Sequence, residues 1–263
     1  MRFESSVLYV EGFLKKQFRK NAGLWKILLT FKPFVYNLLF LKPPTHPLTV
    51  ERIIDLYSSE KKDLFFIQIG ACDGVRADPI NKFINRDQWS GILVEPVKYL
   101  FDELVINYKN SKNLIFENIA IAEKDGVKDF YSLKNIKEGS SSWKKMLGSF
   151  SPDHMPLEEG EELVKEKINC FTLKTLLKRN NVNKVDLLLI DTEGYDYEII
   201  KFVDFNRIRP DLLIYEWTHL NLRDNNECIR LLKRNKYNLF ECNGDILALS
   251  DSLNEFLKQA SQP

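Results

Sequence analysis

Short apolar segments alternate with amphipathic segments along the chain from Leu48 onward. The apolar segments have the length of strands that are buried on both faces of a parallel sheet. They occupy residues 64–69, 91–96, 114–122, 185–191 and 211–217. Between them, apolar side chains such as Leu100 and Leu104 recur at helical spacing. This alternation predicts an α/β fold with a doubly wound, mostly parallel sheet.

Local signals mark where several of these elements begin or turn. Asp78 stands directly before Pro79, which is the usual order of a helix N-cap and a first-turn proline. Thr172 precedes a second amphipathic segment in the same way. Near the C-terminus, Asn243 and Gly244 separate two alternating runs, the strongest short hairpin signal in a sequence. We therefore expect the sheet to end in an antiparallel hairpin.

Composition and charge divide the chain into an arm and a body. The 263 residues are 44% hydrophobic and 29% charged, which suits one α/β domain with an added segment. Residues 1–50 hold eight basic and two acidic residues, whereas the remainder is net acidic. The proline-rich joint at Lys42–Pro47 is the best boundary. We predict a basic, aromatic helical arm over 1–47 and one domain over 48–263.

The arm contains the only membrane-like stretch, between Leu24 and Leu41. Lys26, Lys32 and Pro33 interrupt this stretch, so its apolar runs are too short to span a bilayer. Two interpretations remain open. The arm packs on the body or on a second subunit, or it lies as an amphipathic helix on an anionic membrane surface.

The cysteines and the N-terminal residues indicate in which cellular compartment the protein is expected. Four cysteines are scattered without a C-x-x-C pair, which supports neither a zinc site nor a disulfide framework. No apolar leader follows Met1. The expected location is the reduced cytoplasm, with peripheral membrane contact if the arm meets lipid.

Glycines and acids at the ends of the first two strands suggest a cofactor. Gly70–Gly74 follows the first strand, where glycine allows a ligand close to the main chain in a parallel sheet. Its spacing is not G-x-G-x-x-G, and Asp73 within it suits a positively charged group better than a pyrophosphate. Glu95 ends the second strand, where an acid can hold the hydroxyls of a ribose. A nucleoside with a cationic tail and no phosphate fits both features, and S-adenosylmethionine is the common cofactor of that kind.

Five further stretches carry a family resemblance. These are "FIQIGACDGV..DP", "IFENIAIAEKDG", "INCFTLKTLL", "VDLLLIDTEGYDYEII" and "RPDLLIYEWTHL", in that order. Together they resemble the FkbM family of S-adenosylmethionine-dependent methyltransferases, over roughly residues 62–250. The resemblance implies a Rossmann-like class I methyltransferase fold with a seven-stranded sheet. It also implies O-methylation of a hydroxyl on a sugar, a glycan or a related metabolite.

The resemblance assigns cofactor roles to particular residues. Those expected around the methionine end of S-adenosylmethionine are Gly70, Ala71, Asp73 and Gly74. Glu95 is expected to hold the ribose, and Asn118, Ile119 and Ala120 to border the adenine. Asp191 is expected where cofactor and acceptor meet. Asp78 has two open roles, since it either faces the cofactor or only caps a helix.

Methyl transfer requires an aligned acceptor and a route for its proton. The base candidates are Asp191, Glu193, Glu216 and His219. Asp191 and Glu216 end strands that should be neighbours, and an ordinary pKa near 6.5 would suit His219 for proton removal. Alternatively, Glu193 only accepts hydrogen bonds from backbone N–H groups at a helix start. His219 is alternatively an ordinary loop residue without a catalytic role. Asp191 and Glu216 are also the candidate ligands of Mg²⁺, which would hold two sugar hydroxyls.

Residues 132–167 form a long insertion between the third and fourth strand candidates. Its position suggests a lid over the acceptor, with Trp143 or Phe150 stacking on a substrate face. A helical excursion over the sheet is the alternative, with the acidic run Glu158–Glu162 as a solvated helix face.

Other functions stay open from the sequence. A nitrogen acceptor or a lipid-linked sugar is compatible with the same cofactor residues. A non-catalytic nucleoside-binding or scaffold module on a methyltransferase fold is the alternative from a different class. Nucleic acid is not an expected partner, because the body is net acidic and its basic residues form no evident groove.

Overall fold

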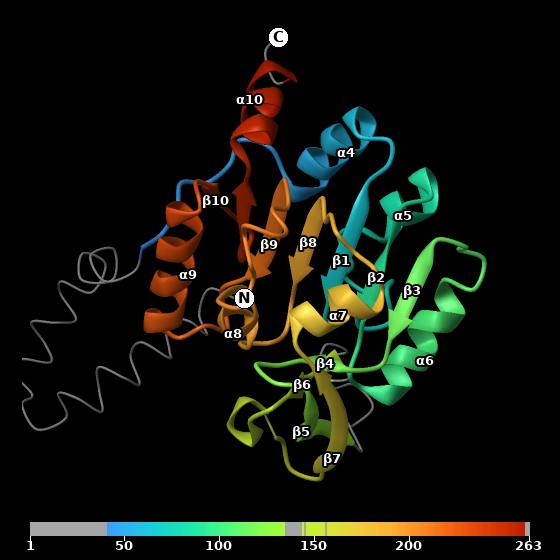
Figure 1. Cartoon of the computed structure of the whole chain (residues 1–263). Helices are drawn as coiled ribbons and strands as arrows, with labels where there is room; N and C mark the ends of the chain where they lie inside the picture. The colour runs from blue at the N-terminus through green and yellow to red at the C-terminus, as the bar shows by residue number, and fades with distance from the viewer. Residues whose placement is uncertain (1–40, 135–143, 145, 156, 261–263) are drawn as a thin grey trace, which may run out of the picture.

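A seven-stranded sheet forms the centre of the computed structural model, which describes residues 41–134, 144, 146–155 and 157–260 (Figure 1). Its strand order is β10-β11-β9-β8-β1-β2-β3. The strands are β1 (Phe65–Ile69), β2 (Ser90–Val94), β3 (Leu114–Glu117), β8 (Leu187–Ile190), β9 (Leu212–Glu216), β10 (Asn238–Cys242) and β11 (Asp245–Leu249). In this sheet β11 runs in the opposite direction to the other six strands. The predicted doubly wound sheet with a C-terminal antiparallel hairpin is confirmed.

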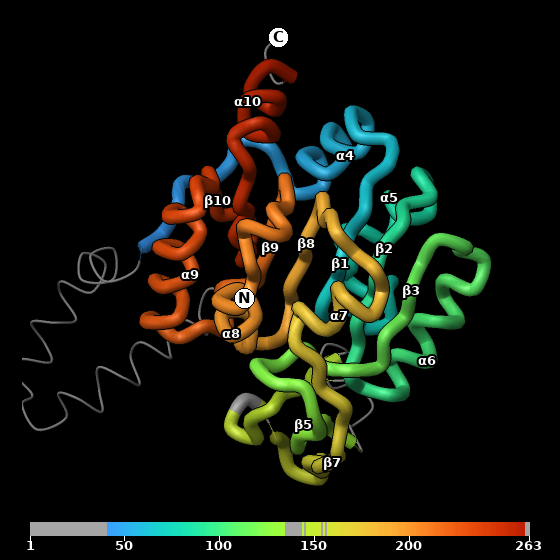
Figure 2. The backbone as a smooth tube through the Cα atoms, in the orientation of Figure 1, coloured from blue at the N-terminus to red at the C-terminus, as the bar shows by residue number. Residues whose placement is uncertain are grey.

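Helices cover both faces of this sheet (Figure 2). One face packs against α7 (Leu173–Arg179), α8 (Asp196–Ile200) and α9 (Leu222–Arg234). The other packs against α4 (Val50–Glu60), α5 (Asn81–Asp87), α6 (Lys98–Asn107) and α10 (Asp251–Ala260). The central strands are buried on both sides, which explains their unbroken apolar sequences.

A second sheet lies beyond the carboxyl ends of the parallel strands (Figure 1). Its order is β4-β7-β5-β6, with β4 (Ala120–Ile121), β5 (Gly126–Lys134), β6 (Gly148–Ser149) and β7 (Glu162–Phe171). A short 3-10 helix, η2 (Pro152–His154), follows β6. The long strands β5 and β7 pair antiparallel from Gly126 opposite Cys170 to Lys134 opposite Glu162.

This second sheet corrects two expectations. Residues 114–122 do not form one strand, because β3 ends at Glu117 and the chain enters the second sheet at Ala120. The acidic run is not a helix face either, since it forms a turn that leads into β7. Within that turn Glu161 is buried, and its carboxylate lies 3.0 Å from the Lys144 ammonium. The rest of the acidic run is exposed, as expected, and only Glu161 forms a buried ion pair.

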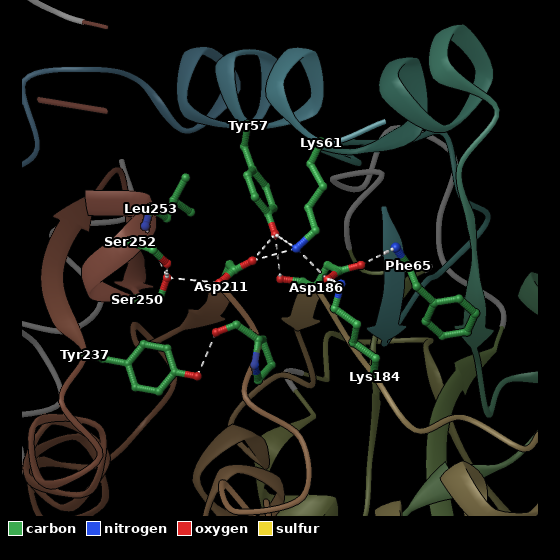
Figure 3. A network of polar contacts seen from close by, with 11 residues as sticks. Tyr57, Lys61, Phe65, Lys184, Asp186, Asp211, Tyr237, Ser250, Ser252 and Leu253 are labelled. Carbon is green, nitrogen blue, oxygen red and sulfur yellow. Dashed lines mark hydrogen bonds and ion pairs between the residues drawn. The ribbon is translucent and has the colours of Figure 1, made fainter. Parts of the chain in front are cut away.

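Polar contacts join the amino ends of two central strands to α4 (Figure 3). Asp186 precedes β8 and Asp211 precedes β9. The Lys61 ammonium lies 2.6 Å from the Asp186 carboxylate and 2.7 Å from that of Asp211. The Tyr57 hydroxyl donates to Asp211 at 2.8 Å. This group, Tyr57, Lys61, Asp186 and Asp211, lies at the edge of the sheet opposite the second sheet.

The proline-rich joint is attached to the edge strand β10. Thr45 forms an isolated bridge with Glu241, whose backbone N–H donates to the Pro44 carbonyl at 2.9 Å. The backbone N–H of Leu41 donates to Asn226 on α9 at 2.8 Å. Residues 1–40, which make up most of the predicted arm, lie outside the described residues. No helix in the described ranges is long and apolar enough to cross a membrane.

Candidate active site

Gly70 makes the sharp turn that follows the central strand β1. Its backbone N–H and that of Ala71 both donate to the Val94 carbonyl at 3.0 Å. Gly70 has a φ of +84°, and a Cβ there would lie 1.8 Å from the Asp191 carbonyl oxygen. The sequence suggested that the side chain is absent to admit a ligand. In the structure, the backbone at the end of the neighbouring strand β8 already requires glycine.

The rest of the turn is held by its own side chains. A Cβ at Gly74 would lie 2.5 Å from Tyr108, so this glycine allows α6 to pack closely. The buried Asp73 carboxylate accepts from the backbone N–H groups of Val75 and Arg76 at 3.0 and 2.8 Å. Burial opposes ionisation of Asp73, but these bonds and the Arg76 guanidinium lower its pKa overall. Asp73 therefore shapes the turn, and its contact with a cofactor stays a prediction.

Glu95 connects the turn to the end of β2. Its side chain is buried and accepts from the backbone N–H groups of Cys72 at 2.9 Å and Val97 at 2.8 Å. Burial raises the pKa of Glu95 to about 7, although these bonds favour the charged form. The Asn118 amide donates to the Glu95 carbonyl at 2.8 Å. The structure thus brings together the turn, the predicted ribose-binding acid and the first predicted adenine-bordering residue.

The remaining predicted cofactor residues lie around this group. Ile119 and Ala120 follow Asn118 and are buried where the chain passes from β3 to β4. Asp78 accepts from the backbone N–H groups of Ile80 at 2.8 Å and Asn81 at 3.2 Å. Burial raises the pKa of Asp78 to about 6. These contacts bridge the turn before α5, which begins at Asn81 with Ile80 at the N-cap position. Asp78 is therefore not the predicted N-cap, and its contact with the cofactor stays a prediction.

Asp191 and Glu216 lie beside each other at the carboxyl edge of the sheet, as the sequence predicts. Strands β8 and β9 are parallel neighbours, with Ile190 opposite Tyr215, so the next residues emerge together. Asp191 keeps an accessible surface although protein surrounds it. Burial, together with the carboxylates of Glu216 and Glu193, raises the pKa of Asp191 well above its ordinary value.

His219 contacts two of the other base candidates. Its Nδ1 lies 2.5 Å from the Glu193 carboxylate and 3.1 Å from that of Glu216. Hydrogen bonds to Glu193 and Glu216 raise the pKa of His219 to about 11. This differs from the ordinary histidine pKa expected from the sequence, because two carboxylates stabilise the protonated imidazole. It positions the two carboxylates and is not a free base in this arrangement.

The group of side chains that could bind a metal differs from the predicted pair, Asp191 and Glu216. Among the described residues, ligand atoms of Glu193, Glu216 and His219 lie within 4.8 Å of one another, and Asp191 is not part of this group. Glu193 reaches it from a left-handed backbone with a φ of +53°. Such a conformation is uncommon outside glycine and asparagine and directs the Glu193 side chain toward His219.

One acid of this region, Asp245, was missed by sequence reasoning, whereas Asp196 was considered as a possible third metal ligand beside Asp191 and Glu216. Asp245 begins β11 opposite Glu216, and its charge acts on Asp191. Asp196 is fully buried, accepts from the Thr192 hydroxyl at 2.9 Å, and has a pKa raised to about 7 by burial and by Glu216. The predicted hairpin was the available signal for Asp245, but sequence alone does not fix the register of its pairing with β9.

Phe150 joins the second sheet to the loop after β8. Its ring centroid lies 5.2 Å from that of Phe130 on β5 and 4.8 Å from that of Tyr195. The Tyr195 hydroxyl donates to Glu123 at 3.0 Å. In this structure Phe150 packs within the protein, and its stacking on a substrate stays a prediction. Trp143, the other predicted stacking residue, lies outside the described residues.

Comparison with known proteins gives a family and several structural likenesses. The family model "Methyltransferase FkbM domain" matches residues 68–239. An FkbM methyltransferase structure from Methylobacillus flagellatus shares 12% identity at a TM-score of 0.47, over 72% of this chain and 44% of that one. A precorrin-6y C5,15-methyltransferase from Geobacter metallireducens shares 14% identity at a TM-score of 0.37, over 81% and 93%. A methyltransferase from Pyrococcus furiosus shares 11% at 0.36, over 94% and 95%. No curated protein matches the chain.

The family match runs from the end of β1 to the start of β10 and covers the site described above except Asp245 on β11. The chain spans less than half the length of the Methylobacillus protein. The strand order and the single antiparallel strand β11 are those of the class I methyltransferase fold, as the resemblance predicts. Membership of this family implies S-adenosylmethionine as the methyl donor. This chain belongs to the FkbM methyltransferase family.

Proposed function

We propose that this protein transfers a methyl group from S-adenosylmethionine to a hydroxyl group of a sugar, a glycan or a related metabolite. The observation that carries the proposal is the hydrogen bond from the Cys72 backbone to the Glu95 carboxylate. It fixes the turn after β1 against the end of β2, at the edge where open α/β sheets bind nucleosides. Asn118 extends the same arrangement to the end of β3.

The reaction is a displacement at the methyl carbon of the sulfonium. The acceptor oxygen forms a bond to that carbon, and the carbon–sulfur bond breaks with its electron pair passing to sulfur. The products are S-adenosylhomocysteine, the methyl ether and the proton of the hydroxyl. Because the sulfonium is already a good leaving group, the protein mainly has to align the acceptor and accept that proton.

The acidic edge supplies groups for both tasks. Glu193 and Glu216 are held by His219, and Asp191 lies next to them with an accessible surface. Carboxylates accept hydrogen bonds from hydroxyl groups, so neighbouring acids suit an acceptor with several hydroxyls. In our proposal Asp191 takes the proton, because its backbone carbonyl lies directly against Gly70 in the turn after β1. Glu193, Glu216 and His219 then position the acceptor.

Two variations of this function remain as proposals. A lipid-linked sugar would use the same acceptor edge, with the basic N-terminal arm on an anionic membrane surface. A non-catalytic nucleoside-binding or scaffold module would use the cofactor residues alone. The grouping of four acids and a histidine beyond the predicted cofactor residues favours catalysis over that alternative.

Binding of the cofactor product tests the first half of the proposal. Calorimetric titration with S-adenosylhomocysteine should show one site on the wild-type chain and weaker binding by Glu95→Gln and Asn118→Ala. Asp102→Asn is the matched control, because Asp102 is an exposed acid on α6 that pairs only with Lys98 among the contacts seen. Absence of binding by the folded wild-type protein would remove the methyltransferase proposal.

Transfer of a labelled methyl group tests the second half. Incubation of S-adenosylmethionine with hydroxylated acceptors, including free and lipid-linked sugars, should yield an acceptor heavier by one methyl group. The Asp191→Asn variant should bind S-adenosylhomocysteine but transfer slowly. Cofactor binding without transfer to any hydroxyl, together with transfer to an amine, would replace O-methylation by N-methylation.

A further inference from the structure

Three side chains from two strand ends converge on one point at the acidic edge. Glu193 comes from the loop after β8, Glu216 ends β9, and His219 lies three residues later. Glu216 is buried, whereas Glu193 and His219 keep part of their surface accessible. The group therefore has a buried side and a side open to solvent.

One of the two distances from His219 within this triad matches a coordination shell, and the other is close to it. Metal–ligand bonds of about 2.1 Å at angles of 90–110° place neighbouring ligand atoms about 3.0–3.4 Å apart. His219 Nδ1 lies 3.1 Å from the Glu216 carboxylate, within that range. Its 2.5 Å separation from the Glu193 carboxylate is a hydrogen-bond distance, and it would have to open by about 0.5 Å. Glu193 is in a loop, so a small side-chain rotation achieves this.

The surrounding charge also favours a cation. The charges of Glu193, Glu216, Asp196 and Asp245 all act on Asp191 at this edge. Glu193 and Glu216 are the two of these acids that contact His219. Asp196 is fully buried, and its Oδ1 has no hydrogen-bond partner among the described residues. A buried carboxylate oxygen without a partner is costly unless a cation is near. This is a second observation, separate from the distances within the triad.

We propose that Glu193, Glu216 and His219 bind one divalent transition-metal ion of the Mn²⁺ or Zn²⁺ type, which replaces the proton on His219 Nδ1 and releases it to solvent. The imidazole ligand distinguishes this site from a Mg²⁺ site, because Mg²⁺ prefers oxygen ligands alone. Three protein ligands leave coordination positions open for other groups. The role of the ion in aligning acceptor hydroxyls rests on the proposed function, but its binding to the triad does not.

Metal binding is measured on the full chain without cofactor or acceptor. After treatment with a chelator and dialysis, the protein is titrated with Mn²⁺, followed by electron paramagnetic resonance, and with Zn²⁺, followed by calorimetry. We expect one ion per chain, with affinity reduced at least about tenfold in Glu193→Gln and in His219→Asn. Co²⁺ should give a visible absorption band that is lost in His219→Asn.

Matched variants make the result decisive. Glu227→Gln alters a partly exposed acid on α9 that pairs with Arg230, and it should leave metal binding unchanged. S-adenosylhomocysteine binding by the same variants should be unchanged, which separates failure of the metal site from failure of the cofactor site. Absence of stoichiometric binding by the wild type, or equal binding by His219→Asn, would show that the triad is only an ion pair.

Discussion

At the scale of single residues, Glu95 holds the backbone of the turn after β1 in addition to its proposed contact with the cofactor ribose. Its carboxylate accepts from Cys72 and Val97 while fully buried, and burial raises its pKa to about 7. A charged carboxylate at this depth is tolerated only because two backbone donors face it. The sequence placed an acid at the end of β2 correctly, but it gave no sign that the turn after β1 depends on it.

The pKa of Glu95 predicts how stability changes with pH. Because the folded pKa exceeds the ordinary value of 4.5, the Glu95 contribution is most favourable below pH 4.5 and declines as pH rises to about 7. The decline is on the order of 3 kcal/mol. Urea unfolding of wild type and Glu95→Gln from pH 4.5 to 8 should show the free-energy difference shifting by this amount in favour of the variant. Parallel pH curves for the two proteins would contradict the prediction.

Gly70 gives a second prediction at this scale. A Cβ in Gly70→Ala meets the Asp191 carbonyl, and the backbone also has positive φ, so unfolding should become easier by more than about 2 kcal/mol. Gly126→Ala separates the two effects, because Gly126 has a φ of +150° but open space around its Cβ position. It should cost about 1 kcal/mol. Thermal unfolding measures both, and equal losses would mean that backbone conformation alone requires glycine at Gly70.

At the scale of elements, the sequence predicted the central sheet better than the second one. The strands β1, β2, β8 and β9 are short, mainly apolar runs that lie buried in the sheet. Such a run predicts a buried strand whichever strands pair with it. Strands β5 and β7 carry charged residues along much of their length, and their pairing partners are far apart in the chain. The local pattern there could not reveal a strand, because long-range pairing stabilises it.

Lys61 provides a prediction about how α4 is attached. Lys61→Met would leave the buried Asp186 and the neighbouring Asp211 without their shared ammonium, which should destabilise the fold by about 2 kcal/mol. Lys184→Met is the matched control, since Lys184 contacts the same Asp186 carboxylate at 3.0 Å but is mostly exposed. It should cost less than about 1 kcal/mol. Urea unfolding at neutral pH compares them, and equal effects would argue against a special role for Lys61.

At the scale of the whole molecule, the two sheets meet at the acidic edge. The second sheet lies beyond the carboxyl ends of the central strands, and Phe150 packs on Tyr195 in the loop that also carries Glu193 (Figure 1). The loop after β8 and the second sheet are therefore one packed unit in this structure. This arrangement could not be derived from the sequence, because it depends on contacts between β5, β7 and the loop after β8.

Removal of the Phe150 ring should loosen that unit. Phe150→Ala loses the contacts with Phe130 and Tyr195, so amide hydrogens of β5 and β7 should exchange roughly tenfold faster. Amides of β1 and β8 should be unaffected. Phe202→Ala, at an exposed phenylalanine after α8, is the control. Hydrogen exchange read by mass spectrometry decides this, and unchanged protection of β5 would show that the second sheet is stable without the contact.

The attachment of Pro44–His46 to β10 has a consequence for association between molecules. β10 is the outermost strand on its side, and an open strand edge offers unpaired backbone groups to any other extended chain. The bridge at Thr45 and the hydrogen bond from Glu241 to Pro44 occupy part of that edge, and Pro44 itself has no N–H to offer a further strand. The proline-rich joint therefore protects β10 from edge-to-edge aggregation. A shortened chain beginning at Leu48 would lose this protection.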